Sequence, residues 1–109
     1  MLGWWITIIS LPPEEADKLI GREATAPHML ANWEVGTSGL RWLNDLVDAG
    51  KAKKLKNEGY PSRYVARAAD VLPFIETPKE WMRQLVHRPE NIEKCSAETV
   101  LTIDAWDLS

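Results

Sequence analysis

Few side chains in this 109-residue sequence could bind a metal or act as a nucleophile. The two histidines, His28 and His87, are far apart, and neither has a second ligand type at helical spacing. A zinc site would therefore need distant residues such as Asp104 or Asp107. The single cysteine, Cys95, excludes an internal disulfide and a cysteine-based zinc site. A neighbouring lysine could favour its thiolate, but nothing in the sequence places a histidine beside it. We predict no metal, no cofactor and no catalytic residue, and an enzyme that uses Cys95 is only a third hypothesis.

Residues 36–39, with the sequence GTSG, could bind phosphate, because they precede a predicted helix whose first N–H groups are free. The segment lacks the lysine and the length of a P-loop. We favour the ordinary interpretation, in which Gly36 ends one helix and Thr37 or Ser38 caps the next.

Basic residues are concentrated in one part of the chain. The formal net charge is −3, yet lysine and arginine outnumber acidic residues within residues 41–67, and acidic residues predominate on both sides. A basic segment of this kind could bind a polyanion or an acidic protein. It could equally neutralise its own acidic neighbours in the folded chain. The sequence leaves both interpretations open.

The pattern within the basic segment predicts a β-hairpin. Residues 51–57 alternate loosely and are rich in lysine, as exposed edge strands often are. Residues 57–59 have turn chemistry, and residues 60–68 would return as the partner strand. Tyrosine and arginine are enriched at protein interfaces. The predicted contact residues are Lys53, Lys56, Tyr60, Arg63, Tyr64 and Arg67.

Two terminal strands and one amphipathic helix are expected to support the hairpin. The apolar run at residues 4–9 predicts a central strand buried on both faces, and its two adjacent tryptophans must point to opposite faces. Residues 99–106, with alternating apolar positions, predict a last strand that pairs with the first. Leucines at helical spacing predict a helix over residues 39–49, which Gly50 would end.

Proline and capping signals predict further helices. One begins near Pro13 and ends by Gly21, and a second covers residues 25–36. A third covers residues 77–87, because a capping box with proline at the first helical position begins there. Residues 70–75 predict an apolar turn or a short helix.

These elements predict one α+β domain over residues 1–109. The sheet would be small and antiparallel, would include the paired N- and C-terminal strands and the basic β-hairpin, and would be covered by three to four short helices. A hydrophobic fraction of 45% suits a single packed core. The apolar start, residues 1–11, lacks a basic n-region and is too short to span a bilayer. We therefore expect a cytoplasmic protein with no membrane association.

The function predicted from these features is binding rather than catalysis. The leading hypothesis is a non-enzymatic module that uses the basic hairpin to contact an acidic patch on another protein and inhibits it sterically. In character the chain is similar to toxin-neutralising immunity proteins and phage-encoded inhibitors, although it shares no motif with them. This hypothesis predicts that changing Arg63 and Arg67 to glutamate abolishes binding and leaves thermal stability nearly unchanged.

The alternative hypothesis is a nucleic-acid-binding regulator. A helix followed by a basic hairpin resembles a winged-helix arrangement. Asp45 and Asp48 would be exposed on that helix, however, and phosphates would repel them. Nucleic acid is therefore the less favoured partner.

Overall fold

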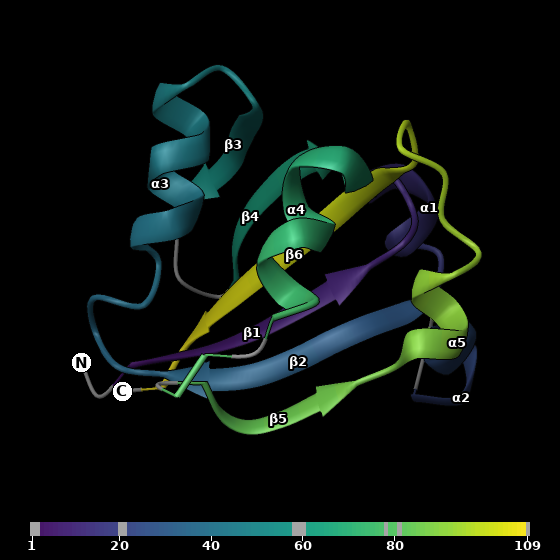
Figure 1. Cartoon of the computed structure of the whole chain (residues 1–109), viewed down its shortest axis with the longest axis horizontal. Helices are drawn as coiled ribbons and strands as arrows, with labels where there is room; N and C mark the ends of the chain where they lie inside the picture. Colours follow the sequence, from purple (N-terminus) through teal and green to yellow (C-terminus); the bar gives the residue numbers. More distant parts are fainter. Residues whose placement is uncertain (1–2, 20–21, 58–60, 78, 81, 109) are drawn as a thin grey trace.

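A single antiparallel sheet forms the centre of the molecule (Figure 1). The computed structural model describes residues 3–19, 22–57, 61–77, 79–80 and 82–108. The six strands lie in the order β3-β4-β6-β1-β2-β5. The strands are β1 (Trp4–Ile9), β2 (Met29–Val35), β3 (Ala52–Asn57), β4 (Ser62–Arg67), β5 (Arg83–His87) and β6 (Val100–Asp107). The helices are α1 (Pro13–Ala16), α2 (Arg22–Thr25), the 3-10 helix η1 (Ala26–His28), α3 (Arg41–Asp48), α4 (Ala68–Ile75) and α5 (Pro89–Ile92). The predicted α+β class is confirmed.

The first and last strands pair, as predicted. β1 and β6 are antiparallel neighbours, with Trp4 opposite Asp107 and Ile9 opposite Thr102. β2 occupies the other side of β1, and β4 occupies the other side of β6. Both terminal strands are therefore interior strands, which explains why the apolar residues in their middle parts are buried, although Val100 and Trp106 of β6 remain exposed.

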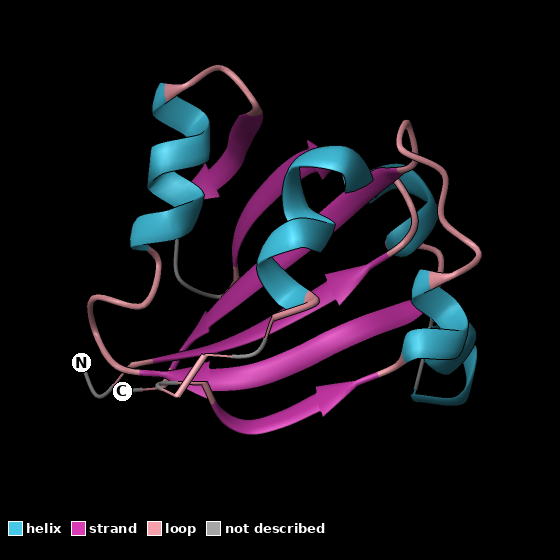
Figure 2. Ribbon diagram, in the orientation of Figure 1, coloured by secondary structure: helices cyan, strands magenta, loops and turns pink. Residues whose placement is uncertain are grey.

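Helices α3 and α4 cover one face of the sheet, and Figure 2 shows α4 lying across the strands. Alternate residues of each interior strand point to this face, and those that include Ile6, Ile8 and Ile103 are fully buried. The ring of Trp42 on α3 stacks on Phe74 of α4, with ring centroids 4.2 Å apart. The core is therefore a two-layer packing of helices against a sheet.

Two predicted helices are strands. The helix predicted over residues 25–36 is wrong, because residues 29–35 form β2, which pairs with β1 along its whole length. The side chains at alternate positions, Ala31, Trp33 and Val35, all point into the core. Leu30 is also buried, near an irregularity in the register. Met29, Leu30 and Trp33 of the same segment fit one face of a short helix almost as well. These residues form a strand because they pair with the edge of β1 that would otherwise have no partner.

The helix predicted over residues 77–87 is also wrong. Thr77 lies in a bend, and residues 83–87 form β5, which pairs irregularly with β2. Gln84 has a positive φ of 53°, a conformation that a helix cannot contain. Pro78 and Trp81 lie outside the described residues. A capping box is a local signal, and here the edge of the sheet outweighs it.

The segment that begins with α1 covers part of the opposite face of the sheet. Pro13 is the first residue of α1, as predicted, although the helix is only one turn long. The hydroxyl of Thr102 donates a hydrogen bond of 2.7 Å to the backbone oxygen of Leu11, which ties this segment to β6. Among the described residues, no helix has the length and apolar character needed to cross a membrane.

Candidate protein-binding surface

The basic hairpin exists and lies at one edge of the sheet. β3 pairs with β4 from Ala52 opposite Ala66 to Asn57 opposite Ser62, and no described strand pairs with the outer edge of β3. β4 is held on its other side by β6. The hairpin is therefore part of the sheet rather than a projecting wing, and β3 is the exposed edge strand that the lysine-rich pattern predicted.

Two of the predicted contact residues are buried. Tyr64 is completely inaccessible on the helix-covered face, and its hydroxyl donates a hydrogen bond of 3.4 Å to the side-chain oxygen of Asn44 on α3. Arg63, on the opposite face, is only 8% exposed. The expectation that these two side chains lie on an exposed face is wrong, because interior strands of a sheet covered on both sides have no exposed face at these positions. Tyr60 lies outside the described residues.

Arg63 is the centre of a buried ion-pair network. Its Nε and Nη2 donate hydrogen bonds of 2.8 and 3.0 Å to the two carboxylate oxygens of Asp104 on β6, directly opposite in the ladder. Its Nη1 donates a bond of 2.7 Å to Asp17, after α1. The hydrogen bond to Asp104, and then that to Asp17, raises the pKa of Arg63 above its ordinary value. Arg63 therefore joins three segments of the fold.

This network bears on the predicted effect of changing Arg63 and Arg67 to glutamate. A glutamate at position 63 would face Asp104 in a buried site, so the variant would lose stability whether or not it bound a partner. The prediction that the Arg63 and Arg67 reversal leaves stability unchanged is therefore inconsistent with this network. Arg67 is different, because its side chain is 54% exposed and pairs with Asp70 and Glu98 at 3.6 and 3.4 Å.

The lysines of β3 remain exposed, although the charge of Lys56, after the hydrogen bond and charge of Arg63, helps to lower the pKa of Asp17. Lys53, Lys54 and Lys56 are exposed along β3, and none of them forms an ion pair with a described carboxylate. Lys54 lies 5.4 Å from the ring centroid of Tyr64, a cation–π contact that leaves its charge in place. The two interpretations of the basic segment thus apply to different residues. The arginines neutralise acidic neighbours, whereas the lysines face solvent.

Apolar side chains accompany these lysines. Leu55 is 43% exposed between two lysines of β3, and Val100 at the start of β6 is 41% exposed. A shallow groove of about 310 Å³ lies between β3, β4 and the start of β6, beside Val100. Its lining residues are Gly50, Lys51, Ala52, Lys53, Val65, Ala66, Arg67 and Val100. The groove has an apolar floor and a cationic rim, and we call it, together with β3, the lysine edge.

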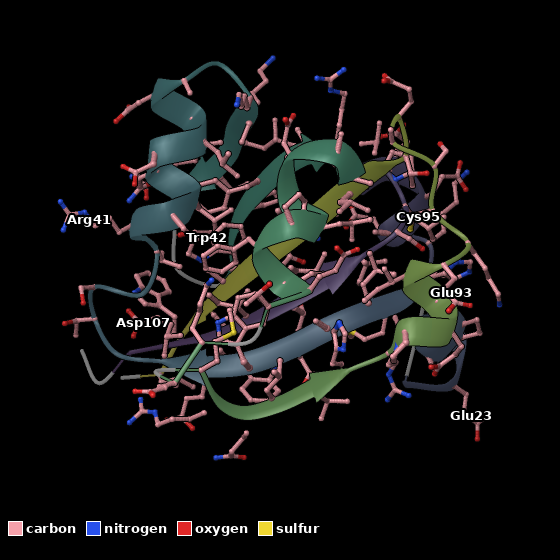
Figure 3. All side chains as sticks on the ribbon, viewed as in Figure 1. Glu23, Arg41, Trp42, Glu93, Cys95 and Asp107 are labelled. Carbon is pink, nitrogen blue, oxygen red and sulfur yellow. The ribbon has the colours of Figure 1, made fainter. Side chains whose placement is uncertain are left out.

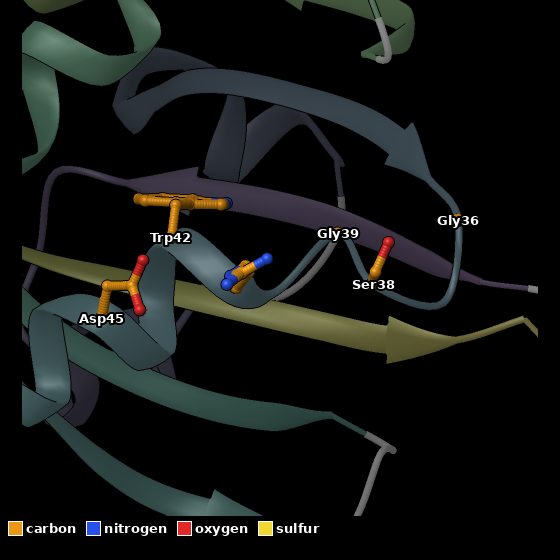
Figure 4. A pocket seen from close by; sticks show the side chains of 6 residues that line it. Gly36, Ser38, Gly39, Trp42 and Asp45 are labelled. Carbon is orange, nitrogen blue, oxygen red and sulfur yellow. The ribbon is translucent and has the colours of Figure 1, made fainter.

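A second hollow, of about 460 Å³, lies at the start of α3 (Figure 4). The favoured interpretation of residues 36–39 needs correction, because Gly36 follows a strand rather than a helix and neither Thr37 nor Ser38 caps α3. The N-cap is Leu40, without a side-chain hydrogen bond. Figure 4 shows Ser38 and Asp45 around the hollow. The carboxylate of Asp45 would repel a phosphate there.

Cys95 and the histidines form no recognisable reactive centre. Burial raises the pKa of the Cys95 thiol, whose sulfur lies 3.8 Å from the backbone oxygen of Asn91. Figure 3 places Cys95 at the opposite side of the molecule from Arg41 and α3. Within the part of the chain that the structure describes, no three His, Cys, Asp or Glu side chains are grouped as a metal site requires.

Comparison with known proteins does not assign the chain. It matches no family model, no curated protein and no solved structure. Function therefore has to be argued from its own geometry and charge.

Proposed function

We propose that this protein acts by binding another protein through the lysine edge, and that the partner presents an acidic patch. The observation that supports the proposal best is the row of exposed lysines on β3, none of which forms a direct ion pair with a described carboxylate. Their charges are available to an outside group, unlike those of Arg63 and Arg67. The proposed activity is non-enzymatic and inhibitor-like: the bound protein would block its partner sterically. We propose that it acts in the cytoplasm.

Three features of the lysine edge fit such a partner. Exposed lysines raise the rate of encounter with an acidic surface. The outer backbone groups of β3 can accept an added strand, a common mode of peptide recognition. Leu55 and Val100 supply apolar contact area beside the charges. Lysine on an edge strand also discourages the strand from pairing with copies of itself, so a partner must bring acidic side chains to bind there.

Nucleic acid fits this surface less well. The exposed acidic residues Asp45 and Asp48 lie on α3, which packs beside β3, so a phosphate backbone following the hairpin would meet negative charge. The hairpin is also held flat in the sheet and offers no wing to enter a groove.

The test compares two double variants with the same change in net charge. Lys53→Glu with Lys56→Glu reverses the lysine edge, and Arg41→Glu with Lys94→Glu reverses exposed charges elsewhere. Wild type and both variants are used to capture proteins from a lysate of the native host, with and without nuclease. Captured proteins are then purified and titrated against all three. We expect both variants to melt within about 4 °C of wild type, because each surface substitution costs about 0.5 kcal/mol or less and each kcal/mol lowers Tm by about 4 °C.

The proposal requires one protein that binds wild type and the Arg41/Lys94 control but binds the Lys53/Lys56 variant at least about tenfold more weakly, a loss of about 1.4 kcal/mol. That binding should weaken as salt increases. Equal binding of the partner by both variants would overturn the assignment of the surface. Capture that disappears with nuclease would replace the protein partner with nucleic acid.

A further inference from the structure

A pocket of about 440 Å³ lies on the face of the sheet opposite α3 and α4, away from the lysine edge. Its floor crosses three neighbouring strands, with Thr7 of β1 opposite Asn32 of β2 and Asn32 opposite Val86 of β5. Trp5, two residues before Thr7 on the same face of β1, also lines it. The volume is within the range of pockets that bind small molecules.

The wall of this pocket is built by the segment that connects α2 to β2. Thr25, Ala26 and Met29 line it. Asn91 of α5, only 7% exposed, donates hydrogen bonds of 3.1 and 2.8 Å to the backbone oxygens of Ala26 and Met29. A buried amide that bridges two carbonyls holds the wall in place without a ligand. The pocket is therefore preformed.

Among the residues that the structure describes, Arg88 is the only charged one that lines the pocket. Its side chain forms no ion pair or hydrogen bond with the described residues, and its Nε is buried without a partner. Its backbone is fixed, because its N–H donates to Leu30 and its carbonyl oxygen accepts from two N–H groups of α5. A buried guanidinium nitrogen with no acceptor is costly, so an acceptor from outside the chain would be stabilising.

The other polar groups of the pocket agree with an anionic ligand. The side chains of Asn32 and Thr7 also form no hydrogen bond with the described part of the chain and can donate to the same group. The nearby carboxylate of Glu34, opposite Trp5 in the ladder, is engaged by Arg83 at 3.4 Å and by Gln84 at 3.0 Å. It does not line the pocket.

We propose that this pocket binds a small organic carboxylate with a flat apolar body. The guanidinium of Arg88 matches a carboxylate in geometry and charge. Trp5, Met29 and Val86 provide the aromatic and apolar surface for the rest of the ligand. This site uses no residue of the lysine edge, so the proposal does not depend on the protein-binding function.

The test uses 2-naphthoate and its neutral analogue 2-naphthamide as probes of the full-length chain. Each is titrated while two-dimensional NMR follows the Trp5 indole N–H and the Asn32 side-chain amide. We expect saturable binding of 2-naphthoate with a Kd at or below about 1 mM. The two followed signals should shift most, and 2-naphthamide should bind at least about fivefold more weakly.

Variants separate the charge from the apolar contact. Arg88→Gln should weaken the binding of 2-naphthoate about tenfold and remove the preference for 2-naphthoate over 2-naphthamide. Arg88→Lys should keep part of that preference. Trp5→Leu should weaken both probes. Arg41→Gln is the control for loss of an arginine elsewhere, because Arg41 on α3 is exposed and does not line the pocket, and it should bind like wild type.

Three results would overturn the proposal. These are equal affinity of wild type for the two probes, no saturation of the 2-naphthoate shifts, and shifts centred on residues outside the pocket. Because all three are measured on wild type, they decide the matter even if Arg88→Gln fails to fold. Thermal melting of each variant shows which affinities belong to folded protein.

Discussion

Replacing Arg63 with methionine would leave the carboxylate of Asp104 alone inside the sheet. The side chains of Arg63 and Asp104 are 10% and 8% exposed, and two hydrogen bonds of 2.8 and 3.0 Å join them. Methionine keeps most of the volume of the arginine side chain but none of its donors. Asp104 would then have neither its cation nor water to replace it.

The expected cost follows from this burial. Removing one partner of a buried ion pair typically costs about 3–5 kcal/mol. Small domains have a free energy of unfolding of about 5–15 kcal/mol, so Arg63→Met should remove roughly a fifth or more of the stability. For a domain of this length each kcal/mol lowers Tm by about 4 °C, which predicts a decrease of roughly 12–20 °C.

A double-mutant cycle measured by urea unfolding tests this reasoning. Asp104→Leu alone should cost less than Arg63→Met, because Arg63 keeps its 2.7 Å bond to the more exposed Asp17. The double variant should cost less than the sum of the two single variants, since it leaves no unpaired buried carboxylate. Lys53→Met, an exposed control on β3, should stay within about 0.5 kcal/mol of wild type. A loss below about 1 kcal/mol for Arg63→Met would refute the argument that Asp104 depends on it.

Two further predictions concern the residues that attach outlying segments to the sheet. The hydrogen bond from Arg63 lowers the pKa of Asp17, and the charges of Arg63 and Lys56 lower it further. The contribution of Asp17 to stability is therefore present above its unfolded-state pKa and disappears as pH falls through its lower folded-state pKa. Urea unfolding between about pH 2 and 6 should therefore show a smaller acid loss for Asp17→Asn than for wild type, and identical slopes would contradict this. Asn91→Ala should lower the free energy of unfolding by about 2 kcal/mol, because the carbonyls of Ala26 and Met29 lose their donor; a change under about 0.5 kcal/mol would show that water replaces the amide.

Much of the sheet could be predicted from the sequence where the pattern was long or had strong end signals. The run Trp4–Ile9 is too apolar and β-branched for anything but a buried strand, and β1 lies inside the sheet. The leucine stripe of α3 and the positive φ of 76° at Gly50 after it fit the predicted amphipathic helix and its end. Lysine at successive positions likewise indicated that β3 would be an edge.

The predictions failed where a short segment could adopt either structure. Residues 29–35 and 83–87 contain apolar residues that fit one face of a helix, and prolines precede both. They form β2 and β5 because β1 and then β2 offered an unpaired edge, and backbone hydrogen bonds across strands outweigh local helix signals. No local pattern records which edge of a sheet still needs a partner.

The candidate site divides in the same way. The sequence by itself determined the composition of the basic hairpin and its place at an edge, because a run rich in lysine is a local property. Only the tertiary structure decided that Arg63 pairs with Asp104, which is 41 residues away, whereas the charge of Lys53 stays exposed. The same is true of Arg88, whose unpaired guanidinium lines a pocket made by three strands. The sequence shows which residues are charged, but the burial and pairing of those charges depend on which distant residues the sheet brings together.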